Sequence, residues 1–163
     1  MSINKYRPHV LVLPEDDADR QLANGFALHF GVDTRSIQVL PIAGGWEKVV
    51  ERFHTEHSTK MQHNMLVHAV LLLDFDGRSE RFQQVHTAIP GDLRDRVFVI
   101  GLWTEPEDLF AEGLPTKEEL GEALASECFQ NRRELWNHRL LMHNSQELIR
   151  MNDVLRPILF KDA

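Results

Sequence analysis

Four short apolar runs alternate with segments of helical periodicity, and this alternation constrains the fold more than any other feature. The runs cover residues 9–13, 36–40, 68–73 and 96–102. The first is continuous rather than alternating, as expected for a strand that is buried on both faces. Strands that alternate with helices form a parallel sheet with helices on both sides. The sequence therefore predicts an α/β, Rossmann-like three-layer fold with a mainly parallel four-stranded sheet.

Helical periodicity follows each of the first three runs. After the first run it continues to Phe30, and Gly31 is expected to cap that helix. A second helix is expected over residues 46–53, followed by a histidine-rich helix end and loop over residues 54–63. A third, polar helix is expected from residue 78 to about residue 88.

The pattern changes beyond Thr104, where no further apolar run occurs. Residues 116–119 have the form of a capping box, and helical periodicity continues through Leu141 and again to Leu159. We therefore expect one domain over residues 1–163, with a core at about 8–110 and a helical C-terminal extension at about 116–160. These C-terminal helices are the candidate surface for a protein partner or a homo-oligomer.

Composition narrows the classes of function. The 163 residues include 25 acidic and 18 basic side chains, so the formal net charge is −7, which argues against a nonspecific basic clamp on DNA. The single cysteine, Cys128, excludes an intramolecular disulfide framework and a CxxC-type zinc site. No apolar run approaches the roughly 20 residues that span a bilayer, and no signal sequence is evident. We expect a soluble, cytoplasmic protein without a membrane partner.

Acidic residues follow two of the predicted strands. Glu15, Asp16 and Asp19 come after the first run, and Asp74 and Asp76 after the third. Ligands of open parallel sheets collect at the carboxyl ends of the strands, and oxygen ligands suit Mg²⁺ or Mn²⁺. A strand period of two would put Asp74 and Asp76 on one side. If the two strands are neighbours, Glu15, Asp74 and Asp76 are expected to form a metal site.

Each of these acidic groups also has a structural explanation. Acidic side chains before a helix cap free amide groups and complement the helix dipole. An Asp-Gly pair after a strand is ordinary turn chemistry. Glu105, after the fourth run, is a further candidate ligand, although its position also suits helix capping. The metal site is favoured because both acidic clusters fall at the same edge of the predicted sheet.

The arrangement resembles the TOPRIM domain family over roughly residues 8–110, and within it the small TOPRIM-like proteins related to OLD-type nucleases. The elements that carry the resemblance are Glu15 with Asp19, then Gly44 and Gly45, then Asp74, Phe75 and Asp76. The family includes topoisomerases, primases and nucleases that perform metal-assisted chemistry on phosphodiesters. One departure is Asp16, which replaces the family's glycine after the glutamate.

The resemblance implies a metal-dependent nuclease that acts on DNA or RNA, either alone or with a partner subunit. Glu15 would then be the general acid/base or a metal ligand, and Asp74 and Asp76 would hold Mg²⁺ or Mn²⁺. Arg78 is the candidate phosphate-binding residue, in a group with Arg81, Arg94 and Arg96 that could form a groove.

Other interpretations remain open. The acidic start also resembles a receiver domain, in which Asp74 would be the phosphate acceptor and Thr104 the switch hydroxyl. That family needs a lysine after a fifth strand, and the next lysine here is Lys117, at a helix start. A third interpretation is a haloacid-dehalogenase-type phosphatase, which places its aspartates on the first strand instead. A TOPRIM-like scaffold without catalytic activity, used only to bind a partner, is a further alternative.

Two weaker motifs have ordinary explanations. His54 and His57 could present two imidazoles on one helix face, but no third zinc ligand is evident nearby. Cys128 lies in an apolar helical context and is expected in the core rather than as a nucleophile.

Overall fold

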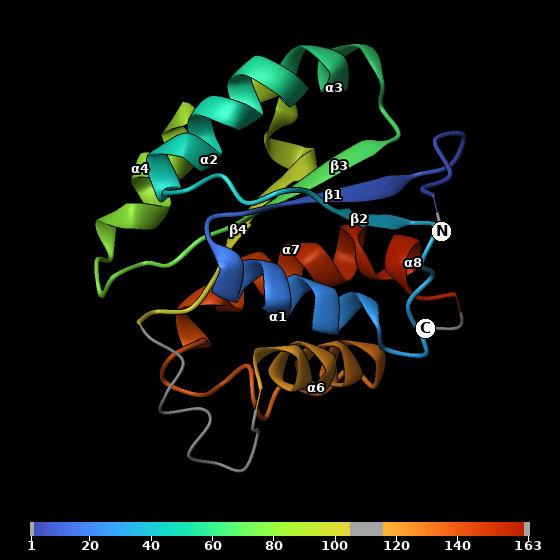
Figure 1. The fold of residues 1–163 in the computed structure, drawn as a ribbon, viewed down its shortest axis with the longest axis vertical. Coiled ribbons are helices and arrows are strands. Elements are labelled where there is room, and N and C mark those ends of the chain that lie inside the picture. Colours follow the sequence, from blue (N-terminus) through green and yellow to red (C-terminus); the bar gives the residue numbers. More distant parts are fainter. Residues whose placement is uncertain (1, 105–115, 162–163) are drawn as a thin grey trace.

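A sheet of four parallel strands forms the centre of the computed structural model, which describes residues 2–104 and 116–161 (Figure 1). The strands are β1 (His9–Pro14), β2 (Ile37–Val39), β3 (Val67–Leu72) and β4 (Val97–Ile100). Their order is β2-β1-β3-β4, and every neighbouring pair is parallel. All four predicted runs thus form strands, and the predicted α/β fold is confirmed.

The apolar runs supply two cores, one on each face of the sheet. Successive side chains of a strand point to opposite faces. On β3, Val70 and Leu72 belong to one core, whereas Ala69 and Leu71 belong to the other. Every residue of β3 is buried, because this strand lies inside the sheet and both of its faces are covered.

One face of the sheet is covered by helices from both ends of the chain. Helices α1 (Asp17–Ala27), α7 (Ser145–Val154) and α8 (Arg156–Leu159) lie along this face, and α6 (Lys117–Phe129) packs against α1 (Figure 1). The C-terminal helices therefore belong to the same core as the sheet. Among the described residues, no helix has both the length and the apolar character needed to cross a bilayer.

Helices α1 and α6 approach each other closely because each places a glycine at the contact. A Cβ atom at Gly25 would lie 1.9 Å from the carbonyl oxygen of Glu118, and a Cβ atom at Gly121 would lie 2.0 Å from that of Leu22. Real Cβ atoms do not approach oxygen so closely, so the two backbones could not pack in this way with any larger residue at either position.

The opposite face is covered by a long helical segment and two shorter elements. The segment comprises α2 (Trp46–Arg52), the π-helical turn η1 (Phe53–Ser58) and α3 (Thr59–His63), and α4 (Glu80–Ala88) and the 3₁₀ turn η2 (Gly91–Arg96) complete the layer. The prediction of a helix end and loop over residues 54–63 is therefore wrong. The helix continues because its apolar side chains Phe53 and Met61 are fully buried against the sheet.

Two other predicted helix ends differ from the structure. Helix α1 ends at Ala27, so Phe30 lies beyond it with 84% of its surface exposed, and Gly31 does not adopt a left-handed conformation. Helix α6 ends at Phe129, whereas helical periodicity predicted its continuation through Leu141.

A Schellman-type turn ends α6. Asn131 has a φ of +56°, its N–H donates to the Cys128 carbonyl, and the Arg132 N–H donates to the Glu127 carbonyl. This hydrogen-bond pattern satisfies the last carbonyls of a helix and redirects the chain. The apolar residues that follow, including Trp136 and Leu140, are buried from turns rather than from a helix.

Side chains cover the outer edge of β4. The Glu147 carboxylate accepts a hydrogen bond from the Val99 N–H at 2.9 Å. The Asn144 side chain accepts from the Gly101 N–H at 3.2 Å and donates to the Gly101 carbonyl at 2.9 Å. Asn144 ends the 3₁₀ turn η3 (Met142–Asn144), and Glu147 lies in the first turn of α7. Together they provide the bonds that another strand would otherwise make.

Candidate metal centre

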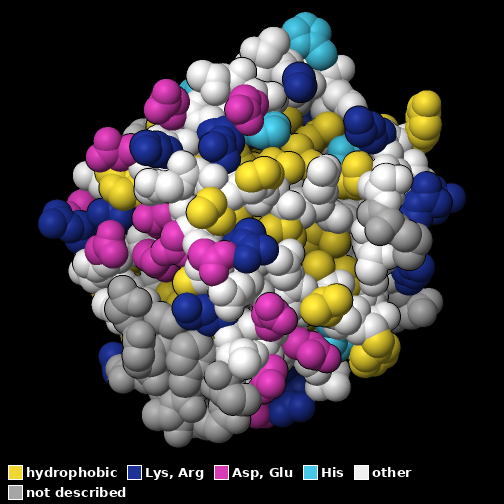
Figure 2. All heavy atoms as spheres, viewed as in Figure 1, with side chains coloured by type: hydrophobic (Ala, Val, Ile, Leu, Met, Phe, Trp, Pro, Cys, Tyr) yellow, Lys and Arg dark blue, Asp and Glu magenta, His cyan; other side chains and the backbone are white. Residues whose placement is uncertain are grey.

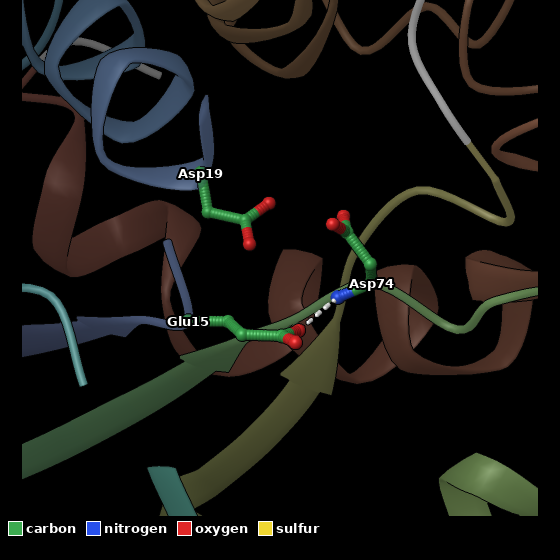
Figure 3. Close-up of side chains that lie close together, drawn as sticks. All are labelled: Glu15, Asp19 and Asp74. Carbon is green, nitrogen blue, oxygen red and sulfur yellow. Dashed lines mark hydrogen bonds between the residues drawn. The ribbon is translucent and has the colours of Figure 1, made fainter. Parts of the chain in front are cut away.

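Three carboxylates meet at the carboxyl edge of the two central strands. Connections from β1 and β3 lead to opposite sides of the sheet, so the point between them is where the strand order reverses. Glu15 follows β1, Asp74 follows β3, and Asp19 lies in the first turn of α1 (Figure 3). Each offers an oxygen atom, and these atoms all lie within 4.8 Å of one another.

Glu15 is fixed by the ends of both strands. Its N–H donates to the Leu72 carbonyl at 2.8 Å, which extends the pairing of β1 with β3. Its side-chain Oε2 accepts a hydrogen bond from the Asp74 N–H at 2.7 Å (Figure 3). This bond holds one oxygen of the carboxylate in place.

Asp19 is the most deeply buried member of the cluster, with 1% of its surface exposed. Its N–H donates to the Asp16 side chain at 2.9 Å, so Asp16 is the N-cap of α1 and anchors the turn that carries Asp19. The Asp19 Oδ2 atom is buried and has no hydrogen-bond partner in the structure. Buried polar atoms without a partner are uncommon and call for an explanation.

Crowding raises the pKa of all three carboxyl groups. Burial, followed by the charges of Asp74 and Asp16, raises the pKa of Asp19 to about 10. Burial, followed by the charges of Asp16 and Glu15, raises the pKa of Asp74 to about 7. Burial also raises the pKa of Glu15, against the opposing effect of the hydrogen bond from Asp74. The cluster therefore holds protons that a cation could replace.

Asp76 lies near this cluster but is not one of its members. Strand β3 ends at Leu72, and Asp76 has a φ of +53°, so the strand alternation that linked it to Asp74 does not extend to it. Its side chain is 60% exposed, and its Oδ2 lies 3.1 Å from Arg81 Nη1. A metal-binding role for Asp76 stays a prediction.

Arg81 is the basic residue that holds the turn after β3. The same Nη1 atom donates to the Asp74 carbonyl at 3.1 Å, and the guanidinium stacks on the Trp46 ring at 4.5 Å from its centroid. The side chain is almost fully buried. Its position in the sequence, one helical turn after the Asp-x-Asp-Gly turn, was the available signal, but the sequence alone placed it in one group with Arg78, Arg94 and Arg96 as part of a possible groove.

The other predicted arginines divide into two groups. Arg78 is exposed, and its Nη1 lies 3.8 Å from Glu80 Oε1. An exposed ion pair of this kind contributes little to stability, so Arg78 can exchange it for a contact with a ligand. Arg94 donates to the Ile89 carbonyl, and Arg96 donates to the carbonyls of Asn64, Val67 and Met61. Arg94 and Arg96 therefore bind the protein's own backbone.

The glycine pair lies beside Glu15. The Gly44 N–H donates to the Glu15 carbonyl at 2.8 Å, and both Gly44 and Gly45 have positive φ values, of 94° and 147°. Glycine adopts such angles readily, which allows the chain to turn from the end of β2 into α2. Glu105 lies outside the described residues.

The remaining sequence candidates are not part of a metal site. In the part of the chain that the structure describes, the Glu15, Asp19 and Asp74 cluster is the only group of three or more possible ligand residues close enough to share an ion. His54 and His57 therefore lack a third ligand there. Cys128 is buried in the core, and burial raises the pKa of its thiol to about 12, which makes it a poor nucleophile.

Comparison with known proteins found no matching family model, no similar curated protein and no similar solved structure. The description of this protein therefore rests on its fold and its candidate site. It is an α/β protein with a buried carboxylate cluster at the point where the strand order of a parallel sheet reverses.

Proposed function

We propose that this protein is a divalent-metal-dependent enzyme that acts on nucleic-acid phosphodiesters, a TOPRIM-like nuclease. One observation carries the proposal. Three carboxylates from two strand ends and a helix offer oxygens within 4.8 Å of one another, and one of them, Asp19, keeps a buried oxygen without a partner. Oxygen ligands of this kind suit Mg²⁺ or Mn²⁺.

The residues present fit such an ion. If all three were deprotonated, the carboxyl groups would repel one another, and the nearby guanidinium of Arg81 is already bonded to Asp76 and to the Asp74 carbonyl. Glu15, Asp19 and Asp74 would hold the ion, which would stabilise negative charge on a phosphodiester and lower the pKa of a bound water.

The protein's own groups have distinct tasks in this proposal. Glu15 is the acid/base candidate, because the hydrogen bond from the Asp74 N–H fixes the orientation of its carboxylate beside the cluster. Asp16 and Arg81 position the site, the first through the α1 cap and the second through the turn at Asp74. Arg78 is the group proposed to meet a substrate phosphate, since its side chain is 64% exposed.

The receiver-like alternative is less well supported. It needs a lysine after a fifth strand, but among the described residues the sheet ends at β4, whose edge is covered by Asn144 and Glu147. The inactive, partner-binding scaffold predicts no metal affinity. Measurements of metal binding and of phosphoryl transfer to the protein therefore distinguish the nuclease, the receiver-like domain and the inactive scaffold.

Calorimetry with MgCl₂ and MnCl₂ tests the metal site. We expect wild-type protein to bind one of these ions, and Asp19→Asn and Asp74→Asn to weaken binding at least about tenfold, because each removes a ligand. Asp153→Asn, which removes a charge from an exposed position on α7, is the matched control and should bind like wild type. No binding by wild type, or equal weakening in the control, would contradict the metal site.

Activity is tested on single- and double-stranded DNA and on RNA in the presence of Mn²⁺. We expect cleavage that Glu15→Gln abolishes while the variant's melting temperature stays close to that of wild type. Intact-mass analysis after incubation with a small phosphoryl donor provides the counter-test. A stoichiometric phosphate adduct that is absent from Asp74→Asn would favour the receiver-like function instead.

A further inference from the structure

A pocket lies at the opposite end of the sheet from the carboxylate cluster. It has a volume of about 530 Å³, within the range of small-molecule sites. Its wall includes His9 at the start of β1 and Val67 at the start of β3, whereas the carboxylates follow the ends of these strands. Glu15 follows His9 by six steps along an extended strand, a span of roughly 20 Å.

The ionisable side chains of this pocket are all lysines and histidines. They are Lys5, His9, His57, Lys60 and His63, and none of the lining residues is Asp or Glu. The chain as a whole has 25 acidic against 18 basic residues. A pocket without carboxylates is therefore a local reversal of the protein's charge, and such a reversal attracts anions.

One helical segment supplies three of these side chains. His57, Lys60 and His63 recur at every third residue from the π-helical turn η1 into α3, and all three line the pocket. A π-helical turn is rare and occurs frequently at functional sites. The buried Nε2 of His57 has no hydrogen-bond partner, and a carboxylate oxygen of Glu56 lies 3.8 Å from it.

The rest of the wall is largely apolar. Leu11, Leu40 and Val67 line the pocket from β1, the end of β2 and β3. Figure 2 shows Lys/Arg and His side chains, with Asp/Glu side chains among them, bordering exposed hydrophobic side chains in the upper half of this face, below the position of α3 in Figure 1. A ligand that fits this wall has both a negative group and an apolar body.

We propose that this pocket binds a small organic phosphate monoester of about the size of a nucleoside monophosphate, whose organic part packs on the apolar wall. Two lysines match the charge of about −1.5 to −2 that a phosphate monoester has at pH 7. A hydrogen bond of 2.8 Å between its Nδ1 and the Thr59 carbonyl holds the His63 ring in place at the wall of the pocket. The apolar wall receives the body of the ligand. This site is independent of the metal centre.

Calorimetry with adenosine 5′-monophosphate in the presence of a chelator tests the proposal. We expect binding by wild type and by Asp74→Asn alike, because the pocket lies far from the carboxylates. Adenosine lacks the charge and inorganic phosphate lacks the body, so each should bind at least about tenfold more weakly.

A double variant identifies the site. Lys5→Gln with Lys60→Gln should weaken binding about tenfold, since the double variant removes both lysine charges of the pocket. The control, Lys48→Gln with Lys117→Gln, removes two charges outside the pocket and should bind like wild type. The proposal is overturned if the monophosphate does not bind, if adenosine binds equally well, or if both double variants lose affinity equally.

Discussion

Asp19 and Asp76 show how a single residue's backbone decides its role. A helical side chain tilts toward the N-terminus of its helix, so Asp19, one turn into α1, reaches back over the end of β1. Asp76 is shifted away because the chain leaves the strand conformation after Leu72 and turns through a positive φ. The spacing of Asp74 and Asp76 in the sequence indicated a shared site, but it did not show that the strand ends at Leu72, before both residues.

The raised pKa of Asp74 predicts a pH dependence of stability. Its folded-state pKa is about 7 and its usual value is 3.8, so the folded protein binds more protons between these values. The stabilisation by the protonated form is complete below about pH 3.8 and is lost as the pH rises through about 7. Asp19, with a pKa of about 10, stays protonated throughout this range.

We therefore expect the metal-free wild type to lose stability between pH 5 and pH 8 relative to Asp74→Asn, by about 1 kcal/mol or more. The measurement is a series of thermal melts of both proteins in chelator across this range. Parallel curves for the two proteins would show that Asp74 does not titrate there. A large loss of stability in the variant at every pH would instead make Asp74 a structural hydrogen-bond partner.

At the scale of elements, the strands were predictable and the helix ends were not. Each strand is a run of apolar residues, and this pattern is visible without knowledge of its neighbours. The end of α6 depends on one left-handed residue, Asn131, within a stretch whose apolar residues keep a helical spacing. The continuation of α2 through η1 into α3 depends on burial of Phe53 and Met61 against the sheet, which is a tertiary effect.

The contact between α1 and α6 gives a prediction at this scale. Alanine favours a helix by about 1 kcal/mol over glycine, so Gly121→Ala would stabilise an isolated helix. Here the new Cβ would lie 2.0 Å from the Leu22 carbonyl oxygen, and the helices must separate. We expect a net loss of about 1–3 kcal/mol.

Chemical denaturation of Gly121→Ala measures this loss. Gly91→Ala is the matched control, because a Cβ atom there meets nothing within 4 Å and Gly91 is not among the residues with positive φ. The control should unfold like wild type. Equal stability of Gly121→Ala and wild type would mean that the two helices can move apart without cost.

At the scale of the whole molecule, the edge of β4 determines whether the sheet can pair with another chain. An uncovered edge strand presents unpaired N–H and carbonyl groups that pair readily with other chains. The Glu147 carboxylate accepts a hydrogen bond from the Val99 N–H, and it also accepts one from Arg150. Glu147→Ala should cost about 1–3 kcal/mol, the usual cost of leaving a buried donor without a partner.

The same variant should also associate with itself at high concentration. Sedimentation velocity across a concentration series measures this, with Glu134→Ala, at an exposed position, as the control. A monomeric Glu147→Ala protein of unchanged stability would show that the Val99 N–H finds another partner.

The covering of β4 by side chains, rather than by a strand, also sets an order of events during heating. A strand would leave its neighbour only when the sheet itself comes apart, but Asn144, directly before α7, and Glu147, in its first turn, leave together when this one helix separates from the sheet. The sheet would then still be folded, but the edge of β4 would be uncovered and able to pair with another chain. We therefore expect the protein to aggregate on warming while its strands are still folded. A ligand or partner that stabilises the packing of α7 should raise the temperature at which aggregation begins.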